Sequence, residues 1–337
     1  GDYDMENSNY NWSQVQEYRQ EVKHICSVLG WSLAALVLLT QIAGILFGLI
    51  GYLLSYYKVM GVGAELYKIL NSGWFSTAGA HLLAYALVLP VIFAVMEHVP
   101  EVVPEKKRMR PGKFFMFFIL IMGAGYILNI VGNILNIIVA AVTNRSTYNM
   151  NPVNNLFESL NPVVILYVSV LGPVIEEYIF RWKLLNRLRP LGEKAAILFS
   201  ALMFGLMHGN LSQILYATAI GVVLGYVSVK TGRLKYNCIL HIMVNSYSTL
   251  LLLMMSRKTI TISYLLAVRA VPVVTLGMII ASIVICCVNV KKTRLLPGNW
   301  PEGIEYRDFS SAMYLNPGTV VFIVLNLLLA GYYLLLA

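Results

Sequence analysis

Two adjacent carboxylates, Glu176 and Glu177, lie within the apolar stretch PVVILYVSVLGPVIEEYIFRW, which is long enough to cross a membrane. An ionised carboxylate at the centre of a bilayer costs about 2.5–3.5 kcal/mol even on permissive insertion scales. The three aspartates of the chain, Asp2, Asp4 and Asp308, all lie outside the apolar runs. Because buried charges are costly, the glutamate pair predicts a functional site within the membrane.

The two carboxylates are predicted to have different roles, because only one of them shares a helix face with a cation. Glu177 and Arg181 have i, i+4 spacing, so they can form an ion pair on one face. Glu176 is rotated by about 100° from that face. The ion pair with Arg181 keeps Glu177 ionised. The nearby charge of Glu177, together with desolvation, makes Glu176 the better base. A charge cluster that only stabilises the helix bundle is the alternative.

Three polar residues on other apolar segments could complete a hydrolytic site. His208 ends one segment, and His241 and Asn245 share a face of another at i, i+4 spacing. In a zinc hydrolase, Glu176, His208 and His241 would be the metal ligands, with water at an open position. Without metal, Glu176 would deprotonate water, a histidine would assist proton transfer, and Asn245 would stabilise the oxyanion. The sequence leaves both mechanisms open.

Composition indicates the class of protein. Of 337 residues, 58% are hydrophobic and 12% are charged, and the mean hydropathy is +0.70. Soluble domains have about 25% charged residues. We therefore predict an all-α polytopic membrane protein, a bundle of about eight or nine transmembrane helices with an intramembrane polar cavity. The net charge of +9 falls mostly in short loops, so it predicts membrane topology and lipid contact rather than a nucleic-acid partner.

The apolar segments define the expected organisation. Residues 1–25 are predicted to be a polar cytoplasmic tail, and residues 26–337 a single integral membrane domain. The segment 195–208 is short and is expected to end at mid-depth against a cavity. The loop 291–316 is interpreted as a connector on the cytoplasmic side, with a role in substrate recognition as the alternative. The predicted segments are 26–56, 74–97, 114–143, 162–187, 195–208, 211–229, 236–256, 260–290 and 317–337.

The placement of lysine and arginine predicts the orientation. With the N-terminus in the cytoplasm, all four basic clusters lie on the cytoplasmic side, whereas the opposite loop 144–161 has one basic residue. The clusters occupy residues 98–113, 181–194, 230–235 and 291–294. Because no retention or targeting signal is apparent, we expect an integral protein of a bacterial plasma membrane with a cytoplasmic N-terminus.

Other residues within the spans predict how the helices pack. Three asparagines share one helical face and could line a hydrated cavity or form interhelical hydrogen bonds: Asn129, Asn133 and Asn136. Two pairs of glycines have the GxxxG spacing, a weak signal for close helix packing: Gly44/Gly48 and Gly221/Gly225.

The polar residues in the spans resemble the motifs of a known family. EEYIFR, FGLMH and HIMVN fit, in this order, the EExxxR, FxxxH and HxxxN motifs of the CPBP family. This family contains the type II CAAX prenyl endopeptidases and similar bacterial proteins, some of them linked to bacteriocin self-immunity. The resemblance covers residues from about 160 to 256. Each motif alone is weak, but three in order on separate apolar segments are specific.

The resemblance implies an intramembrane metalloendopeptidase, or one in which glutamate activates water without tight metal binding. It implies that the catalytic residues are Glu176, His208, His241 and Asn245. It also implies that the residues supporting the site are Glu177, Arg181 and Phe204. The expected substrates are membrane-associated or membrane-tethered peptides and proteins, and the expected cofactor, in the metal-dependent form, is Zn²⁺.

Two other functions compete with this one. A non-catalytic family member would bind peptides or act as an immunity protein in the membrane. A proton-coupled transporter would also use buried Glu, Arg, His and Asn, although no internal repeat is apparent in the sequence. Other intramembrane proteases are disfavoured, because the sequence has no HExxH, no GxSxG and no aspartate within a span.

Overall fold

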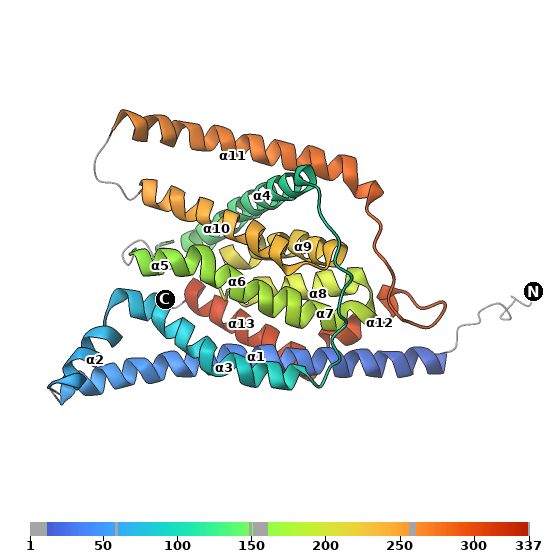
Figure 1. The fold of residues 1–337 in the computed structure, drawn as a ribbon, viewed down its shortest axis with the longest axis horizontal. Helices are drawn as coiled ribbons and strands as arrows, with labels where there is room; N and C mark the ends of the chain where they lie inside the picture. The colour runs from blue at the N-terminus through green and yellow to red at the C-terminus, as the bar shows by residue number, and fades with distance from the viewer. Residues whose placement is uncertain (1–11, 58–59, 148–149, 151–160, 256–260, 336–337) are drawn as a thin grey trace, which may run out of the picture.

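The computed structural model describes residues 12–57, 60–147, 150, 161–255 and 261–335, and every regular element in this part of the chain is helical (Figure 1). The α-helices are α1 (Trp12–Tyr56), α2 (Val62–Leu70), α3 (Ala80–Met96), α4 (Pro111–Thr143), α5 (Pro162–Leu166), α6 (Gly172–Glu177), α7 (Leu185–Leu188), α8 (Glu193–Leu206), α9 (Leu211–Thr231), α10 (Leu234–Met255), α11 (Ile262–Asn289), α12 (Tyr306–Tyr314) and α13 (Pro317–Leu335). The π-helical turns are η1 (Phe75–Gly79), η3 (Tyr167–Leu171) and η4 (Tyr178–Leu184), and the short 3₁₀ turns are η5 (Arg189–Leu191) and η6 (Val290–Lys292).

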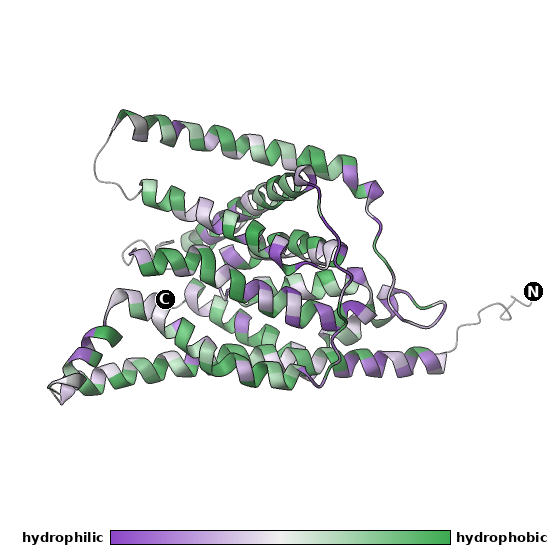
Figure 2. Cartoon of the chain, in the orientation of Figure 1, coloured by the Kyte–Doolittle hydropathy of each residue, from purple (hydrophilic) through white to green (hydrophobic). Residues whose placement is uncertain are grey.

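Eight helical stretches in the described part of the chain are long and apolar enough to cross a membrane. Apolar residues cover most of their length in Figure 2. The prediction of an all-α polytopic membrane protein is therefore confirmed. The predicted segment 195–208 corresponds to α8, whose 14 residues extend about 21 Å, less than the ~30 Å of a bilayer core. Helix α8 is not among the candidate spans, and its end at mid-depth stays a prediction.

The site region lies between α4, α6, α8, α9 and α10. Helix α8 packs along α9, α9 packs along α4, and α11 contacts α4 at the edge of the bundle (Figure 1). Helix α1 packs against α3 and α13. The larger apolar cluster includes Phe180, Leu184, Phe199 and Phe204, all fully buried or nearly so. These side chains hold η4 against α8 and so fix the two elements that flank the predicted site.

The two GxxxG pairs have different surroundings. A Cβ atom added to Gly221 would lie 3.0 Å from the Cα atom of Ala201, and Gly225 faces the same helix, so close packing of α8 on α9 is confirmed. A Cβ atom on Gly44 or Gly48 would meet no described atom within 4 Å. The prediction was wrong for that pair, because this face of α1 is exposed.

The first helix begins before the predicted first span. Helix α1 starts at Trp12, so residues 12–25, which the sequence placed in a polar tail, are helical in their described part. The ring of Tyr18 packs edge-on against Phe309 of α12, with the centroids 5.3 Å apart. The loop 291–316, interpreted as a connector, therefore contains a helix that packs on α1. A nine-residue helix such as α12 is marginal alone, and its packing on α1 stabilises it.

Basic residues gather at one end of the bundle. The loop between α3 and α4, the ends of α7, α9 and α11, and the start of α10 lie near the N-terminal end of α1 (Figure 1). Hydrophilic residues are concentrated at this end (Figure 2). The four clusters therefore share one side of the bundle, as the sequence predicts. That this side is cytoplasmic stays a prediction.

Replacing Gly205 of α8 by alanine is expected to destabilise the fold by about 1–3 kcal/mol. A Cβ atom there would overlap Thr218 and lie 2.7 Å from the carbonyl oxygen of Ile214, both on α9. Thermal unfolding in detergent measures the effect. Gly331→Ala is the matched control, since its Cβ would meet no described atom within 4 Å. Equal unfolding temperatures for the two variants would contradict the packing argument.

Candidate active site

The two glutamates lie in a short helix between two π-helical turns. Helix α6 ends at Glu177, η3 precedes it and η4 follows it. π-helical turns are rare and occur often at functional sites. The side chain of Glu177 is completely buried, whereas that of Glu176 is 23% exposed. The structure thus gives the two carboxylates different surroundings.

The predicted ion pair between Glu177 and Arg181 is present. Arg181 Nε lies 3.2 Å from Glu177 Oε2, and both side chains are fully buried. These two atoms are close without hydrogen-bond alignment. Arg181 lies in η4, whose π-helical turn is wider than a turn of α-helix. Side chains with i, i+4 spacing are therefore offset from each other more than they would be in an α-helix. Arg181 Nη1 also donates to Ser200 Oγ (3.2 Å), and its guanidinium lies 4.7 Å from the centre of the Phe204 ring.

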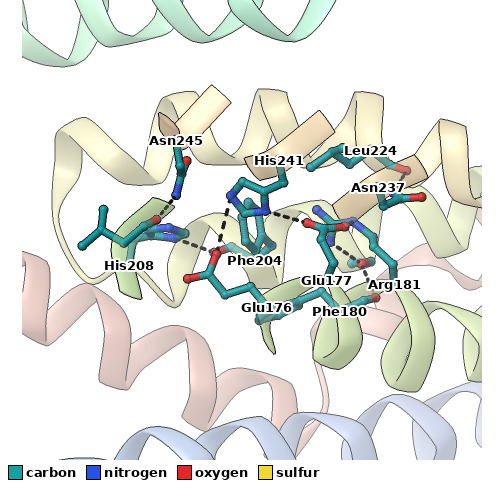
Figure 3. A network of polar contacts seen from close by, with 12 residues as sticks. Glu176, Glu177, Phe180, Arg181, Phe204, His208, Leu224, Asn237, His241 and Asn245 are labelled. Carbon is teal, nitrogen blue, oxygen red and sulfur yellow. Dashed lines mark hydrogen bonds and ion pairs between the residues drawn. The ribbon is translucent and has the colours of Figure 1, made fainter. Parts of the chain in front are cut away.

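His241 lies between the two carboxylates (Figure 3). Its Nδ1 is 3.0 Å from Glu177 Oε1 and its Nε2 is 3.7 Å from Glu176 Oε2. An ionised carboxylate only accepts hydrogen bonds, so the Nδ1 of His241 carries a proton and donates it to Glu177. The Nε2 then faces Glu176. A separation of 3.7 Å is too long for a direct hydrogen bond and suits two acceptors that share one bridging water.

His208 is held by the turn that joins α8 to α9. Its Nδ1 donates to the carbonyl oxygen of Phe204 (2.9 Å), which leaves Nε2 available to a ligand. The turn depends on Gly209, whose φ of 61° is in the left-handed region. Asn210 donates to the carbonyl oxygen of His208 (3.1 Å) and accepts from the backbone of Gln213 as the N-cap of α9. Both histidines therefore use Nδ1 for anchoring.

Asn245 joins α10 to the π-helical turn η3. Its Nδ2 donates to the carbonyl oxygen of Val168 (3.0 Å). In a π-helix this carbonyl would bond to residue 173, but Pro173 has no N–H, and the N–H of Gly172 bonds to Tyr167. Asn245 therefore satisfies a carbonyl that the local backbone leaves without a donor. Its second amide hydrogen remains for a ligand.

The predicted catalytic residues line one cavity. A cavity of about 500 Å³ is bordered by Glu176, His208, His241 and Asn245. Phe204 lies behind them and packs edge-on against both imidazoles. Figure 3 shows these side chains converging from α6, the end of α8 and α10. The cavity volume is in the range of ligand-binding sites. The structure therefore brings the four predicted residues together.

Comparison with known proteins agrees with this geometry. Residues 158–247, which include all four cavity-lining polar residues, match the family described as type II CAAX prenyl endopeptidase Rce1-like. We call residues 158–247 the Rce1-like domain, after the family that they resemble. The matched residues include the whole polar network of Figure 3.

Two bacterial proteins are similar to part of this chain. The putative membrane peptidase YdiL of Bacillus subtilis (strain 168) is 28% identical over 107 residues, which are 31% of this chain and 42% of that protein. The membrane-embedded CAAX protease MroQ of Staphylococcus aureus (strain USA300) is 31% identical over 93 residues, 26% of this chain and 38% of that protein. The chain thus spans about two-fifths of the length of these relatives. No solved structure matches the chain.

Asn237 also belongs to the network, although it lies outside the three sequence motifs. Its Nδ2 donates to the carbonyl oxygen of Leu224 (2.7 Å), and it is completely buried beside Glu177 (Figure 3). This bond ties α10 to α9. Asn237, His241 and Asn245 are spaced by four residues, so they share a helix face. That spacing is the signal that could have identified Asn237 within the Rce1-like domain.

The three asparagines of α4 divide between the two predicted roles. Asn129 lines the cavity. Asn133 Nδ2 donates a long hydrogen bond to Asn129 Oδ1 (3.4 Å). Asn136 is buried and donates to Ser212 Oγ of α9 (2.8 Å), an interhelical hydrogen bond. Helix α4 therefore contributes a polar group to the cavity from outside the Rce1-like domain.

The predicted zinc ligands have no preformed arrangement. Among the described residues, no group of three or more His, Cys, Asp or Glu side chains is placed to hold a metal ion. Zinc binds nitrogen and oxygen ligands at about 2.0–2.2 Å. The metal site at Glu176, His208 and His241 stays a prediction, and the mechanism below uses no metal.

Proposed function

We propose that this protein is an intramembrane endopeptidase that hydrolyses peptide bonds of membrane-associated or membrane-tethered peptides. The observation that carries this proposal is the convergence of Glu176, His208, His241 and Asn245 on one cavity within an apolar bundle. The family of the Rce1-like domain and the names of its bacterial relatives support it.

The reaction begins with a water molecule between Glu176 Oε2 and His241 Nε2. Glu176 removes one proton as the water oxygen attacks the carbonyl carbon of the peptide bond. His241 accepts a hydrogen bond from the other water hydrogen and so orients the water. Glu177 assists indirectly, because its bond to His241 Nδ1 fixes the tautomer and the ring orientation.

The remaining groups act on the intermediate. Asn245 donates its second amide hydrogen to the oxyanion that forms on the carbonyl oxygen. The proton held by Glu176 then moves to the leaving nitrogen, with His208 Nε2 as a relay, and the C–N bond breaks. The remaining proton of the attacking water also passes to the amine, so the products are a carboxylate and a protonated amine. Water is the only co-reactant.

The polar wall of the cavity suits an extended peptide. Inside a membrane, a peptide backbone without hydrogen-bond partners is unstable. Other side chains that line the cavity can supply donors and acceptors: Tyr126, Asn129, Gln213, Tyr216 and Ser248. The surrounding apolar lining of the cavity accommodates hydrophobic side chains. This combination favours a segment unwound from its own helix.

Cleavage can be tested with purified protein in proteoliposomes that contain membrane proteins from a strain lacking the gene. Mass spectrometry of new peptide N-termini is the readout. We expect new N-termini in membrane-tethered substrates, and we expect them to persist after chelator dialysis with zinc well below one equivalent by elemental analysis. Absence of new N-termini would contradict the proposed peptidase activity. Loss after dialysis, with rescue by zinc, would contradict only the metal-free mechanism.

Replacing Asn245 by alanine is expected to lower kcat by about 10²–10³-fold on a peptide found in that assay, with a small change in KM. The fold loses about 1–3 kcal/mol as well, because the carbonyl oxygen of Val168 loses its donor. Ser169→Ala is the control, since it removes another bond between η3 and α10, from Ser169 to Thr249 (3.1 Å). If both variants lower stability and neither lowers kcat, Asn245 is only structural.

A further inference from the structure

A second pocket opens at the end of the bundle where the basic residues gather. Its volume is about 300 Å³, and it shares no lining residue with the cavity that contains Glu176. Three cations and two aromatic rings dominate its lining: Lys106, Arg233, Lys235, Tyr178 and Trp182. The lining contains no acidic side chain. We call this the basic pocket.

The cations of the basic pocket lack acidic partners, unlike their neighbours. Arg187 pairs with Glu101, and Lys107 pairs with Glu105, each at 3.0 Å. In the described part of the chain, no carboxylate pairs with a cation of the basic pocket. The Nε of Arg233 is also buried without a hydrogen-bond partner. A buried donor without an acceptor is destabilising, so an anionic ligand would improve this site.

The backbone holds the pocket at the end of two candidate spans. One span ends at Thr231 and the next begins at Leu234. The N–H of Lys107 donates to the carbonyl oxygen of Thr231 (2.8 Å), which fixes the preceding Lys106 over the turn. Gly232 permits this close approach, because its φ is 58° and a Cβ there would lie 2.9 Å from Pro104.

The aromatic part of the lining points to a ligand at the membrane surface. Tyr178 and Trp182 belong to η4, one turn apart, and both border the pocket beside the cations. Tyrosine and tryptophan are favoured at the level of lipid headgroups, where one part of the ring system is apolar and the other is wet. A dissolved anion would gain little from these rings, whereas a lipid would contact them with its glycerol and acyl carbons.

We propose that the basic pocket binds the phosphate of an anionic phospholipid. Lys106, Arg233 and Lys235 contact the phosphate, and the rings of Tyr178 and Trp182 contact the glycerol and the first acyl carbons. Basic pockets between transmembrane helices are suited to anionic lipid headgroups, with about 1 kcal/mol from each cation near the surface. A bound lipid joins η4 to the start of α10, so it stabilises the folded protein. This proposal is independent of the peptidase activity.

The test compares lipid binding to the full chain in detergent. Native mass spectrometry counts retained dioleoylphosphatidylglycerol and dioleoylphosphatidylcholine, and thermal unfolding is followed with each lipid and with inorganic phosphate alone. The triple variant Lys106→Gln, Arg233→Gln and Lys235→Gln removes the pocket cations. We expect about a tenfold or greater loss of phosphatidylglycerol binding, together with the loss of its thermal stabilisation.

A second triple variant is the matched control. Lys291→Gln, Lys292→Gln and Arg294→Gln removes the same three charges from exposed positions at the same end of the bundle. We expect it to retain phosphatidylglycerol like the wild type. Equal loss in both triple variants, no preference for phosphatidylglycerol in the wild type, or equal stabilisation by inorganic phosphate would each overturn the proposal.

A single variant covers the case in which the triple variant does not fold. Lys106 lies in an exposed loop, so Lys106→Gln is expected to leave the unfolding temperature in phosphatidylcholine unchanged. Its binding of phosphatidylglycerol should fall about fivefold, the effect of one cation near the surface. Binding equal to that of the wild type would overturn the assignment of Lys106 to the phosphate.

Discussion

Replacing Glu176 by glutamine is expected to lower the rate of peptide-bond cleavage by about 10²- to 10⁴-fold, because it removes the general base. Glutamine has nearly the same shape but cannot accept a proton from water. The fold should be unaffected, to within about 0.5 kcal/mol. The Glu176 side chain is 23% exposed, and its Oε2 lies 3.7 Å from His241 Nε2, too far for a direct hydrogen bond. The measurement is the rate at which new N-termini appear in proteoliposomes, together with thermal unfolding.

Glu97→Gln is the matched control for this variant. Glu97 is exposed at the end of α3 and does not line the cavity. The same change from carboxylate to amide should therefore leave cleavage unchanged. If Glu176→Gln retains more than about a tenth of the wild-type rate, Glu176 is not the base. A non-catalytic immunity or peptide-binding protein predicts a wild-type cellular phenotype for Glu176→Gln, and a transporter predicts substrate flux that depends on a proton gradient.

Replacing Glu177 by leucine is expected to destabilise the protein by about 3–5 kcal/mol, because it leaves the guanidinium of Arg181 buried without a carboxylate. Both side chains are fully buried. The double variant Glu177→Leu with Arg181→Met replaces the pair by apolar side chains of similar volume. Its stability should return close to the wild-type value or exceed it. Chemical unfolding in mixed micelles measures this recovery.

Activity should not recover with stability in the double variant. His241 Nδ1 donates to Glu177 Oε1 at 3.0 Å, and leucine offers no acceptor. The ring of His241 then loses its fixed tautomer, and the rate of cleavage stays low although the protein is folded. An active double variant would show that Glu177 does not position His241. A double variant as unstable as Glu177→Leu would contradict the ion-pair argument.

The composition of the site could be predicted from the sequence, because the relevant groups are exceptional in apolar segments. Glu176, His208, His241 and Asn245 converge on one cavity as expected. Helical spacing also predicted that Glu177 and Arg181 pair. These inferences depend on local periodicity and on the high cost of burying polar groups, and both can be read from one chain.

The connections between helices could not be predicted in the same way. His241 bridges the two carboxylates from 64 positions along the chain, and no local pattern specifies which imidazole nitrogen faces which glutamate. The donor to Val168 is another example. Pro173 shows that a backbone donor is missing in that turn, but only the packing of α10 reveals that Asn245 replaces it.

Some errors came from patterns that do not specify a partner. Gly44/Gly48 and Gly221/Gly225 have the same spacing, yet only the second pair lies against another helix. A sequence motif describes one surface, and close packing requires two. Similarly, the polar composition of residues 12–25 suggested a tail, because the partner that supports this helix, α12, is almost 300 residues away in the chain.

The role of Glu176 in peptide-bond cleavage is tested most directly by comparing peptide N-termini in membranes from three strains of the source organism. One strain lacks the gene, one carries the wild-type gene, and one carries Glu176→Gln at equal abundance. We expect a set of new N-termini within or beside membrane-tethered segments that is present in the wild-type strain and absent from the other two strains. Identical N-termini in the wild-type and Glu176→Gln strains would contradict the assignment of Glu176 as the residue that activates water.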